Sequence, residues 1–328
     1  GTIIKLEIEN EDGKNVIELE RGKVSLEESD ASKEILDFNG KKLGYIKVPS
    51  FYSDTECLKL NTYACKSATS DVQKFLRDFR FEGIDGLIMD LRNNGGGYLH
   101  EADSLTRLFI EYGPTVQIKS PNADVIIYDS WKSNRSWSKP LVVLVNKFSA
   151  SASEIFAGAM QDYNRALVVG QTTFGKGSVQ RFTETENGQI KISDSLYYRV
   201  TGEPTQIFGV KPNLEIPSLI DSDGLGEDRY ENAIKPSRIE NSWYYSNEAF
   251  NMDVYLTNHE KRIAESKYFS EMDTIKNYRD NNKKRLSLQI TERESNYEDN
   301  KQRNLKLINL GREISLSLIH ISEPTRPY

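Results

Sequence analysis

The sequence predicts an α/β core followed by a separate helical region, and three observations support this fold class. Strand-like and helix-like segments alternate from residue 43 to residue 217, as expected for a sheet covered by helices. Residues 84–91 and 141–145 are almost wholly apolar, which is typical of strands buried on both faces. From residue 218 onward, charged and amide side chains prevail, and apolar residues recur sparsely at helical spacing.

The first 42 residues are expected to lie outside this core. Residues 1–22 alternate apolar and polar side chains on either side of the turn dipeptide Asp12-Gly13, which predicts a β-hairpin. The polar segment 23–42 is predicted to be a linker. Because the chain begins with Gly1 inside a strand pattern, we expect it to be a piece of a longer protein.

Apolar periodicity predicts the elements of the core. Val72, Phe75, Leu76 and Phe79 recur at spacings of three and four residues, which predicts a helix over residues 70–81. The other expected helices are residues 99–109 and 151–163. The expected strands are residues 43–48, 84–91, 141–145 and 166–169, with β-type segments from 179 to about 200.

Composition argues against several classes of protein. A net charge of −6 over 328 residues disfavours nucleic acid as a general partner, and no apolar run approaches the ~18 residues that span a bilayer. Cys57 and Cys65 lack CxxC spacing, so no metal site is expected; they form either a disulfide or two unrelated thiols. Of the three histidines, only His100 lies where it could serve a serine-histidine triad.

The C-terminal third is expected to consist of a helical region and a terminal segment without function. Residues 218–314 are predicted to form a helical region whose charged residues make a solvated face. Residues 315–328 resemble the translation of a sequencing adapter, and we expect them to be a non-native read-through.

A serine cluster, Ser149-Ala150-Ser151-Ala152-Ser153, lies between an expected buried strand and an expected helix. A serine at a helix start lies near unpaired backbone N–H groups and the positive end of the helix dipole. These features can hold an attacking oxygen and stabilise the anion that it creates. Most serines at such positions are N-caps, and spacing alone does not distinguish which of the three would attack.

Lys176 lies between two glycines, 25 residues after the central serine of that cluster. A lysine is protonated at its ordinary pKa of ~10.4, but burial lowers the pKa and can leave a neutral amine that acts as a base. If the segment is extended, Lys176, Ser178 and Gln180 share one face, and Gln180 could then hydrogen-bond the amine. The alternative is an exposed lysine in a glycine turn.

Two glycine-rich segments complete the pattern. Asn94 is followed by three glycines, residues 95–97, whose backbone N–H groups could face a ligand and form an oxyanion hole; a flexible turn is the alternative. Residues 170–176 fit the phosphate-loop pattern GxxxxGK, but Gly177 stands where a hydroxyl residue should follow and the next segment is β-like. We therefore expect no nucleotide site.

Together these segments resemble the protease core of the C-terminal processing, or tail-specific, proteases, which form serine peptidase family S41 and use a serine-lysine mechanism. The resemblance covers most of residues 1–311, and the long helical tail is similar to that of the larger periplasmic members. The motifs that carry it are Asp90-Leu91-Arg92-Asn93-Asn94-Gly95-Gly96-Gly97, the serine cluster with Glu154, Met160-Gln161-Asp162-Tyr163, Phe174-Gly175-Lys176-Gly177 and Gly209-Val210-Lys211-Pro212-Asn213. Asn213 stands where the family pattern usually has Asp.

The resemblance implies a ββα-repeat protease core of the crotonase or Clp type over residues 43–217. It also implies that residues 1–22 are the C-terminal hairpin of a truncated PDZ domain. A periplasmic location, protein or peptide substrates with apolar C-termini and a membrane-anchored adaptor are further expectations from the family.

The resemblance also assigns roles that spacing leaves open. The assigned residues are Ser151 as the nucleophile, Lys176 as the general base, Gln180 as the residue that orients the lysine, and the backbone N–H groups of Ala152 and Gly96, or Gly95, as the oxyanion hole.

The predicted function is therefore a serine endopeptidase that acts through an acyl-enzyme on proteins recognised by their C-terminal tails, without metal, cofactor or nucleotide. One alternative is a catalytically dead peptide-binding scaffold on the same fold, against which the intact Ser151, Lys176 and Gln180 argue. Another is an acyl-CoA enzyme of the crotonase type, because that fold also uses backbone oxyanion holes.

Overall fold

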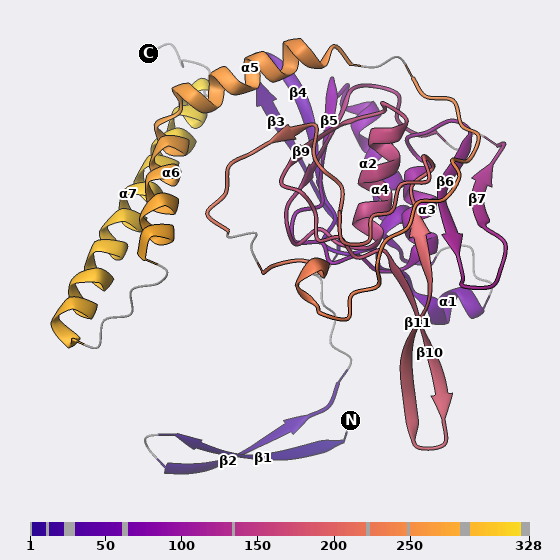
Figure 1. The fold of residues 1–328 in the computed structure, drawn as a ribbon, viewed down its shortest axis with the longest axis horizontal. Helices are drawn as coiled ribbons and strands as arrows, with labels where there is room; N and C mark the ends of the chain where they lie inside the picture. The colour runs from indigo at the N-terminus through magenta and orange to yellow at the C-terminus, as the bar shows by residue number, and fades with distance from the viewer. Residues whose placement is uncertain are drawn as a thin grey trace. The chain divides into compact units, whose positions relative to one another are not determined.

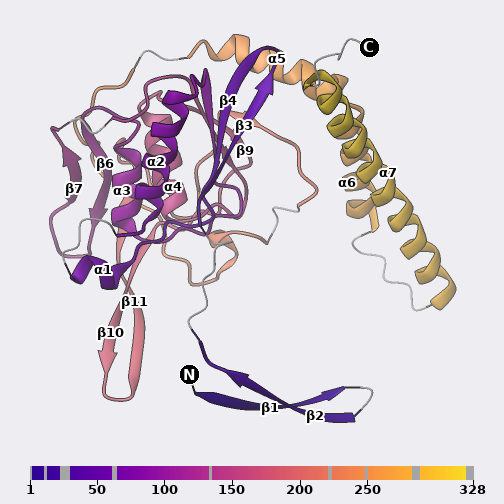
Figure 2. The ribbon, with the colours of Figure 1, turned by 180° about the vertical axis from the view of Figure 1, so that it is seen from behind.

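The structure is a computed structural model that describes residues 2–10, 13–22, 30–60, 65–132, 135–220, 224–247, 250–282 and 289–322. The chain divides into two units, Gly1–Asp30 and Ala31–Tyr328, which Figures 1 and 2 show from opposite sides. In the first unit, β1 (Ile3–Asn10) pairs antiparallel with β2 (Gly13–Glu20). This confirms the hairpin, although Asp12 of its turn lies outside the described residues. Its assignment to a PDZ domain stays a prediction.

The second unit is built on a six-stranded sheet in the order β12-β9-β8-β5-β4-β3. All neighbours except β3 and β4 pair in parallel, so the C-terminal ends of the parallel strands meet at one edge. The strands are β3 (Ser32–Phe38), β4 (Lys41–Lys47), β5 (Gly86–Asp90), β8 (Leu141–Val145), β9 (Leu167–Gly170) and β12 (Leu214–Glu215). The four expected strands of the core are thereby confirmed.

Strand β3 corrects the prediction that residues 23–42 form a linker. It pairs with β4 along its whole length, from Ser32 opposite Lys47 to Phe38 opposite Lys41. Every residue of β3 is exposed, because the strand forms the edge of the sheet. Such a strand lacks the buried, apolar pattern by which strands are identified in a sequence. Residues 23–29 lie outside the described residues.

A second, antiparallel sheet has the order β10-β11-β6-β7. Its strands are β6 (Gly113–Lys119), β7 (Ile126–Ser130), β10 (Ser178–Thr185) and β11 (Gly188–Tyr198). The last two confirm the β-type segments expected after residue 179, and they form a long hairpin that projects from the body of the unit (Figures 1 and 2).

Three helices pack against the two sheets and against one another. They are α2 (Ala68–Phe81), α3 (Leu99–Thr106) and α4 (Ala152–Asp162), and each corresponds to an expected helix. Helix α2 packs on β4, and α4 contacts both β9 of the first sheet and β6 of the second. Fully buried side chains such as Phe79, Phe109 and Phe156 fill the space between the layers. The mixed α/β core is therefore confirmed, while the ββα-repeat assignment stays a prediction.

The cysteines and the C-terminal region complete the fold. Cys57, in α1 (Thr55–Lys59), forms a disulfide with Cys65, which decides between the two alternatives for this pair. The described helices α5 (Met252–Glu265), α6 (Lys267–Asn282) and α7 (Ile290–Ser322) confirm the expected helical region. Helices α6 and α7 share a small core of Met272, Ile275 and Leu307.

Helix α7 continues to Ser322, into the segment 315–328 that the sequence suggests is a read-through; residues 323–328 lie outside the described residues. Among the described residues, no helix has the length and apolarity that crossing a membrane requires.

The packing of α2 on β4 leads to a stability prediction. A methyl group on Gly44 of β4 would lie 2.6 Å from the ring of Phe79, which is fully buried and cannot move aside. We expect Gly44→Ala to lower the free energy of unfolding by about 1–3 kcal/mol, measured by urea denaturation. Gly86→Ala in the adjacent strand is the matched control, because its new methyl group would meet nothing closer than 3.4 Å. Equal stability of the two variants would contradict the packing argument.

Candidate active site

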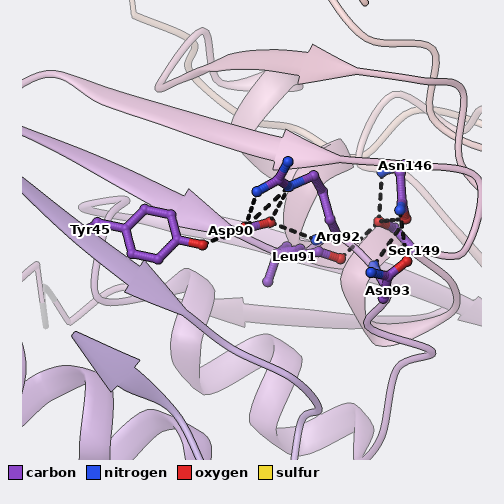
Figure 3. A network of polar contacts seen from close by, with 7 residues as sticks. All are labelled: Tyr45, Asp90, Leu91, Arg92, Asn93, Asn146 and Ser149. Carbon is purple, nitrogen blue, oxygen red and sulfur yellow. Dashed lines mark hydrogen bonds and ion pairs between the residues drawn. The ribbon is translucent and has the colours of Figure 1, made fainter. Parts of the chain in front are cut away.

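The glycine turn and the serine cluster occupy two loops that follow the neighbouring strands β5 and β8. Because these strands are parallel, their C-terminal ends bring both loops to one edge of the sheet, where ligand sites of such sheets commonly lie. Figure 3 shows the hydrogen bonds that join the loops. The backbone N–H of Asn93 donates to Asn146 Oδ1 at 2.9 Å, Asn146 Nδ2 donates to Asn93 Oδ1 at 2.8 Å, and Ser149 Oγ donates to Leu91 O at 2.8 Å.

Asp90 anchors the start of the glycine turn (Figure 3). Its carboxylate accepts hydrogen bonds from Arg92 Nη2 at 2.7 Å and from the Tyr45 hydroxyl at 2.6 Å. Burial works to raise the pKa of Asp90, but these donors outweigh it and hold the pKa below its ordinary value. Burial and the neighbouring Asp90 raise the pKa of Tyr45 to about 12. The ion pair between Asp90 and Arg92 therefore fixes the start of the turn, and neither side chain is available there as a free acid or base.

The structure separates the three serines that spacing could not. Ser149 and Ser153 are both fully buried, and their hydroxyls donate to the backbone carbonyls of Leu91 and Asn94. Ser151 is only partly buried and immediately precedes α4. Its φ of 57° is unusual for a residue other than glycine, and such strained backbone often occurs at functional sites. Ser151 is thus the serine whose side chain is open to a groove.

This groove has a volume of about 480 Å³. It brings together Ser151, Lys176 and Gln180, as the sequence predicts, with Ala152 and Gly97. The other described residues that line it are Tyr98, Leu99, His100, Ile155, Ser178, Val179, Phe182, Lys191 and Tyr197. The His100 Nε2 lies 3.1 Å from Ser53 Oγ, and the hydrogen bonds found among the described residues do not join His100 to Ser151.

Lys176 is half-buried in the groove wall. Burial lowers the pKa of its amine, and the positive charge of Lys191 acts in the same direction, against the weaker opposing effects of Glu227 and Glu154. Gln180 lies on the same groove but is exposed, and its Nε2 donates to Ser193 Oγ at 3.2 Å. Within the described part of the chain, no hydrogen bond joins Gln180 to Lys176, so its orienting role stays a prediction.

The Gly96 amide already has an acceptor in the structure. Its backbone N–H donates to the buried Oδ1 of Asn94 at 2.9 Å, a bond that it would have to give up to serve an oxyanion. Gly96 also allows close approach, since a methyl group on it would lie 2.8 Å from Ser151 Cβ. Gly95 is not among the residues that line the groove, whereas Gly97 is. The Asn94 side chain thus bonds one of the three glycine amides, as asparagine often does two residues before a turn amide.

The phosphate-loop alternative does not fit the structure. Residues 171–177 contain no helix and lead into strand β10, whereas a phosphate loop opens a helix. The backbone N–H groups of Gly175 and Lys176, which would have to face a phosphate, both donate to Glu154.

The sequence patterns assign no role to Glu154. Its carboxylate is fully buried, and its Oε2 accepts from the backbone N–H groups of both Ser151, at 2.7 Å, and Lys176, at 2.9 Å. Its Oε1 accepts from the N–H of Gly175, at 2.7 Å, and from the Thr173 hydroxyl. Burial raises the pKa of Glu154 to about 7, against these donors, which favour the ionised form. The spacing Ser-x-x-Glu is a capping-box signal that could have indicated this contact.

Tyr197 holds the same two residues from their carbonyl side. Its buried hydroxyl lies 3.1 Å from Ser151 O and also hydrogen-bonds Lys176 O. One carboxylate and one hydroxyl therefore bind the main chains of Ser151 and Lys176, although 25 residues separate them in the sequence.

The bonding of Glu154 leads to a direct prediction for Glu154→Gln. An amide has only one acceptor oxygen, so its NH₂ group must face at least one backbone N–H. We expect the free energy of unfolding to fall by about 1–3 kcal/mol and the labelling rate of Ser151 by a fluorophosphonate to fall by about 10²-fold.

Glu101→Gln is the matched control, because that buried carboxylate accepts one backbone N–H, from Thr69 at 2.9 Å, which an amide oxygen can also accept. Full labelling of the Glu154→Gln variant would contradict the positioning role.

Comparisons with known proteins identify the family of the chain. Residues 42–216 match peptidase family S41, and residues 220–319 match the C-terminal domain of tail specific protease. The second match includes the first residues of the segment 315–328.

The tail-specific protease of Haemophilus influenzae is 34% identical over 330 residues, which cover 94% of this chain and 45% of that protein. The carboxy-terminal-processing protease of Bartonella bacilliformis is 38% identical over 153 residues, covering 45% of this chain and 35% of that protein. The chain thus spans less than half the length of these two curated relatives.

A solved structure shares the fold. It is the photosystem II D1 C-terminal processing protease, with a TM-score of 0.50 and 26% identity, covering 68% of this chain and 57% of that one. Since the S41 match extends over more than half of the residues, the chain belongs to peptidase family S41, among the tail-specific and C-terminal processing serine proteases.

Proposed function

We propose that the chain is the catalytic part of a serine endopeptidase in which Ser151 is the nucleophile and Lys176 the general base. The observation that carries this proposal is that one groove is lined by both the partly exposed Ser151 and a half-buried lysine with a lowered pKa. A neutral amine next to a serine hydroxyl is a known way to activate that nucleophile.

In the acylation step, neutral Lys176 takes the proton of the Ser151 hydroxyl while Oγ bonds to the carbonyl carbon of a substrate peptide. The carbonyl oxygen becomes an oxyanion, for which we assign the backbone N–H groups of Ala152 and Gly97 as donors. Ala152 is the first residue of α4 and lines the groove, where the positive end of the helix dipole favours an anion. The protonated lysine then gives its proton to the leaving amine as the C–N bond breaks.

Deacylation uses the same groups. Lys176, neutral again, takes a proton from water while the water oxygen attacks the ester carbon of the acyl-enzyme. The lysine returns this proton to Ser151 Oγ when the C–O bond breaks, which restores the starting state. No metal, nucleotide or organic cofactor enters either step.

The substrates that we propose are proteins recognised by their C-terminal tails, preferably apolar ones, which are cleaved or degraded with the help of a membrane-anchored adaptor. The names of the tail-specific and carboxy-terminal-processing relatives support tail recognition. The disulfide between Cys57 and Cys65 fits the proposed periplasmic location, because disulfides persist in oxidising compartments.

The first test compares Ser151→Ala and Lys176→Ala with the parent chain on an unfolded protein with an apolar C-terminus. We expect both variants to lose cleavage by at least about 10³-fold and to keep their fold by circular dichroism. Ser149→Ala is the control, since its hydroxyl hydrogen-bonds Leu91 O away from the groove. Cleavage that survives both substitutions would place the site elsewhere, and no cleavage by a folded parent chain would favour the peptide-binding scaffold.

The pH dependence provides a second test. Only the neutral amine of Lys176 can accept a proton, so kcat/KM should rise with pH through the lowered pKa of Lys176. Lys191 contributes to that lowering; Lys191→Gln should therefore raise the pKa and move the rising limb to higher pH. A limb that stays in place, or moves to lower pH, would contradict the coupling between the two lysines.

A further inference from the structure

The β10–β11 hairpin presents a free strand edge beside the catalytic groove. Strand β10 is the outermost strand of its described sheet, where only β11 pairs with it. It begins at Ser178, two residues after Lys176, and Ser178, Gln180 and Phe182 all line the groove. An unpaired strand edge offers backbone N–H and C=O groups to another extended segment, and this one continues directly from the proposed catalytic lysine.

The two faces of the hairpin carry different side chains. Phe182 is 66% exposed and lies opposite Lys191 in the strand register, with the Lys191 amine 5.7 Å from its ring centroid. Both side chains line the groove. Arg181, the neighbour of Phe182, must point to the opposite face, and it forms an ion pair with Asp194 at 2.6 Å.

The described lining of the groove includes Lys191 and no carboxylate, although the chain as a whole has a net charge of −6. Lys191 therefore keeps a positive charge in the groove when Lys176 is neutral. Glu154 accepts its hydrogen bonds below the groove surface, where it is fully buried. Among the described residues, no ion pair is found for Lys191, so its charge is not neutralised by a neighbouring carboxylate.

We propose that the substrate segment beside the scissile bond adds as an extended strand to the edge of β10, with an apolar side chain on Phe182 and a carboxylate at Lys191. This inference rests on the proposed peptidase function and specifies its substrates. Main-chain pairing tolerates many sequences, whereas pockets for alternate side chains select among them. Continuity with the groove identifies the substrate as the occupant, and charge complementarity identifies the carboxylate.

The carboxylate has two possible sources, an acidic side chain or the free C-terminus of the substrate. Both can be tested by binding to the full chain carrying Ser151→Ala, which cannot form an acyl-enzyme. The probes are short fluorescein-labelled apolar peptides in which one Glu is moved along the sequence. Each has a Gln counterpart and a C-terminally amidated counterpart, and fluorescence anisotropy gives the dissociation constants.

For a side-chain source, we expect Glu at one position to bind about threefold more tightly than Gln, as for an exposed ion pair. For a C-terminal source, the peptide with a free C-terminal carboxylate should bind more tightly than the amidated peptide by a similar factor. In either case Lys191→Gln should bring the ratio of the two dissociation constants to about one. Lys191→Glu should make a peptide with Lys at that position bind more tightly than the peptide with Glu there. Arg181→Gln is the matched control, because it removes a charge from the other face of the same hairpin and should leave the ratio intact.

Strand addition has its own readout. N-methylation of successive peptide bonds should weaken binding at every second residue, because alternate N–H groups of a strand face its partner. Equal binding of acid and neutral peptides, or equal effects of Lys191→Gln and Arg181→Gln, would overturn the carboxylate subsite. If N-methylation weakened binding equally at successive residues, strand addition would be overturned. Charge-dependent binding by a parent chain that cleaves nothing would overturn the peptidase proposal alone.

Discussion

The buried carboxylate of Glu154 is the constraint on which the rest of the groove depends. An ionised group without partners inside a protein is costly, so it persists only where donors surround it. Here the donors are backbone N–H groups of the two segments that must meet, the start of α4 at Ser151 and the segment that carries Lys176. Desolvation outweighs these donors and raises the pKa of Glu154 to about 7. The Tyr197 hydroxyl also joins these two residues, because it hydrogen-bonds the carbonyl groups of both.

Hydrogen bonds also connect the Glu154 site to the glycine turn. Asn94 is fully buried; its side chain bonds Val48 O and the Gly96 N–H, and its own carbonyl accepts from Ala150 N and Ser153 Oγ. The turn after β5, the loop after β8 and the segment before β10 are thus one network rather than three independent loops. A network of this kind can hold Ser151 at a φ of 57°, because the surrounding bonds over-determine its backbone.

Sequence patterns predicted most of the core and only part of the site. Buried strands such as β8 and amphipathic helices such as α2 have strong periodicity, whereas the exposed edge strand β3 does not, and β6 and β7 were not expected at all. Ser151, Lys176 and Gln180 could be assigned by resemblance because they occupy motif positions. The bond of Gln180 to Ser193 and the bond of Glu154 to the Lys176 amide join residues that lie apart in the sequence, and no local pattern specifies them, although the Ser-x-x-Glu spacing was a hint of the role of Glu154. The bond from the Gly96 amide to Asn94 is local, because an asparagine side chain often accepts from the backbone two residues on, so the asparagine before the glycines was an available signal.

If Ser151 attacks the substrate with Lys176 as its base, the acyl-enzyme can be trapped on Ser151. The chain would be mixed with an activated peptide ester, quenched in acid, digested and mapped by mass spectrometry. We expect an acyl adduct on Ser151 in the parent chain, which accumulates faster as pH rises and is absent from Lys176→Ala. An adduct on another residue, or equal acylation of Ser151 without the lysine, would contradict this mechanism.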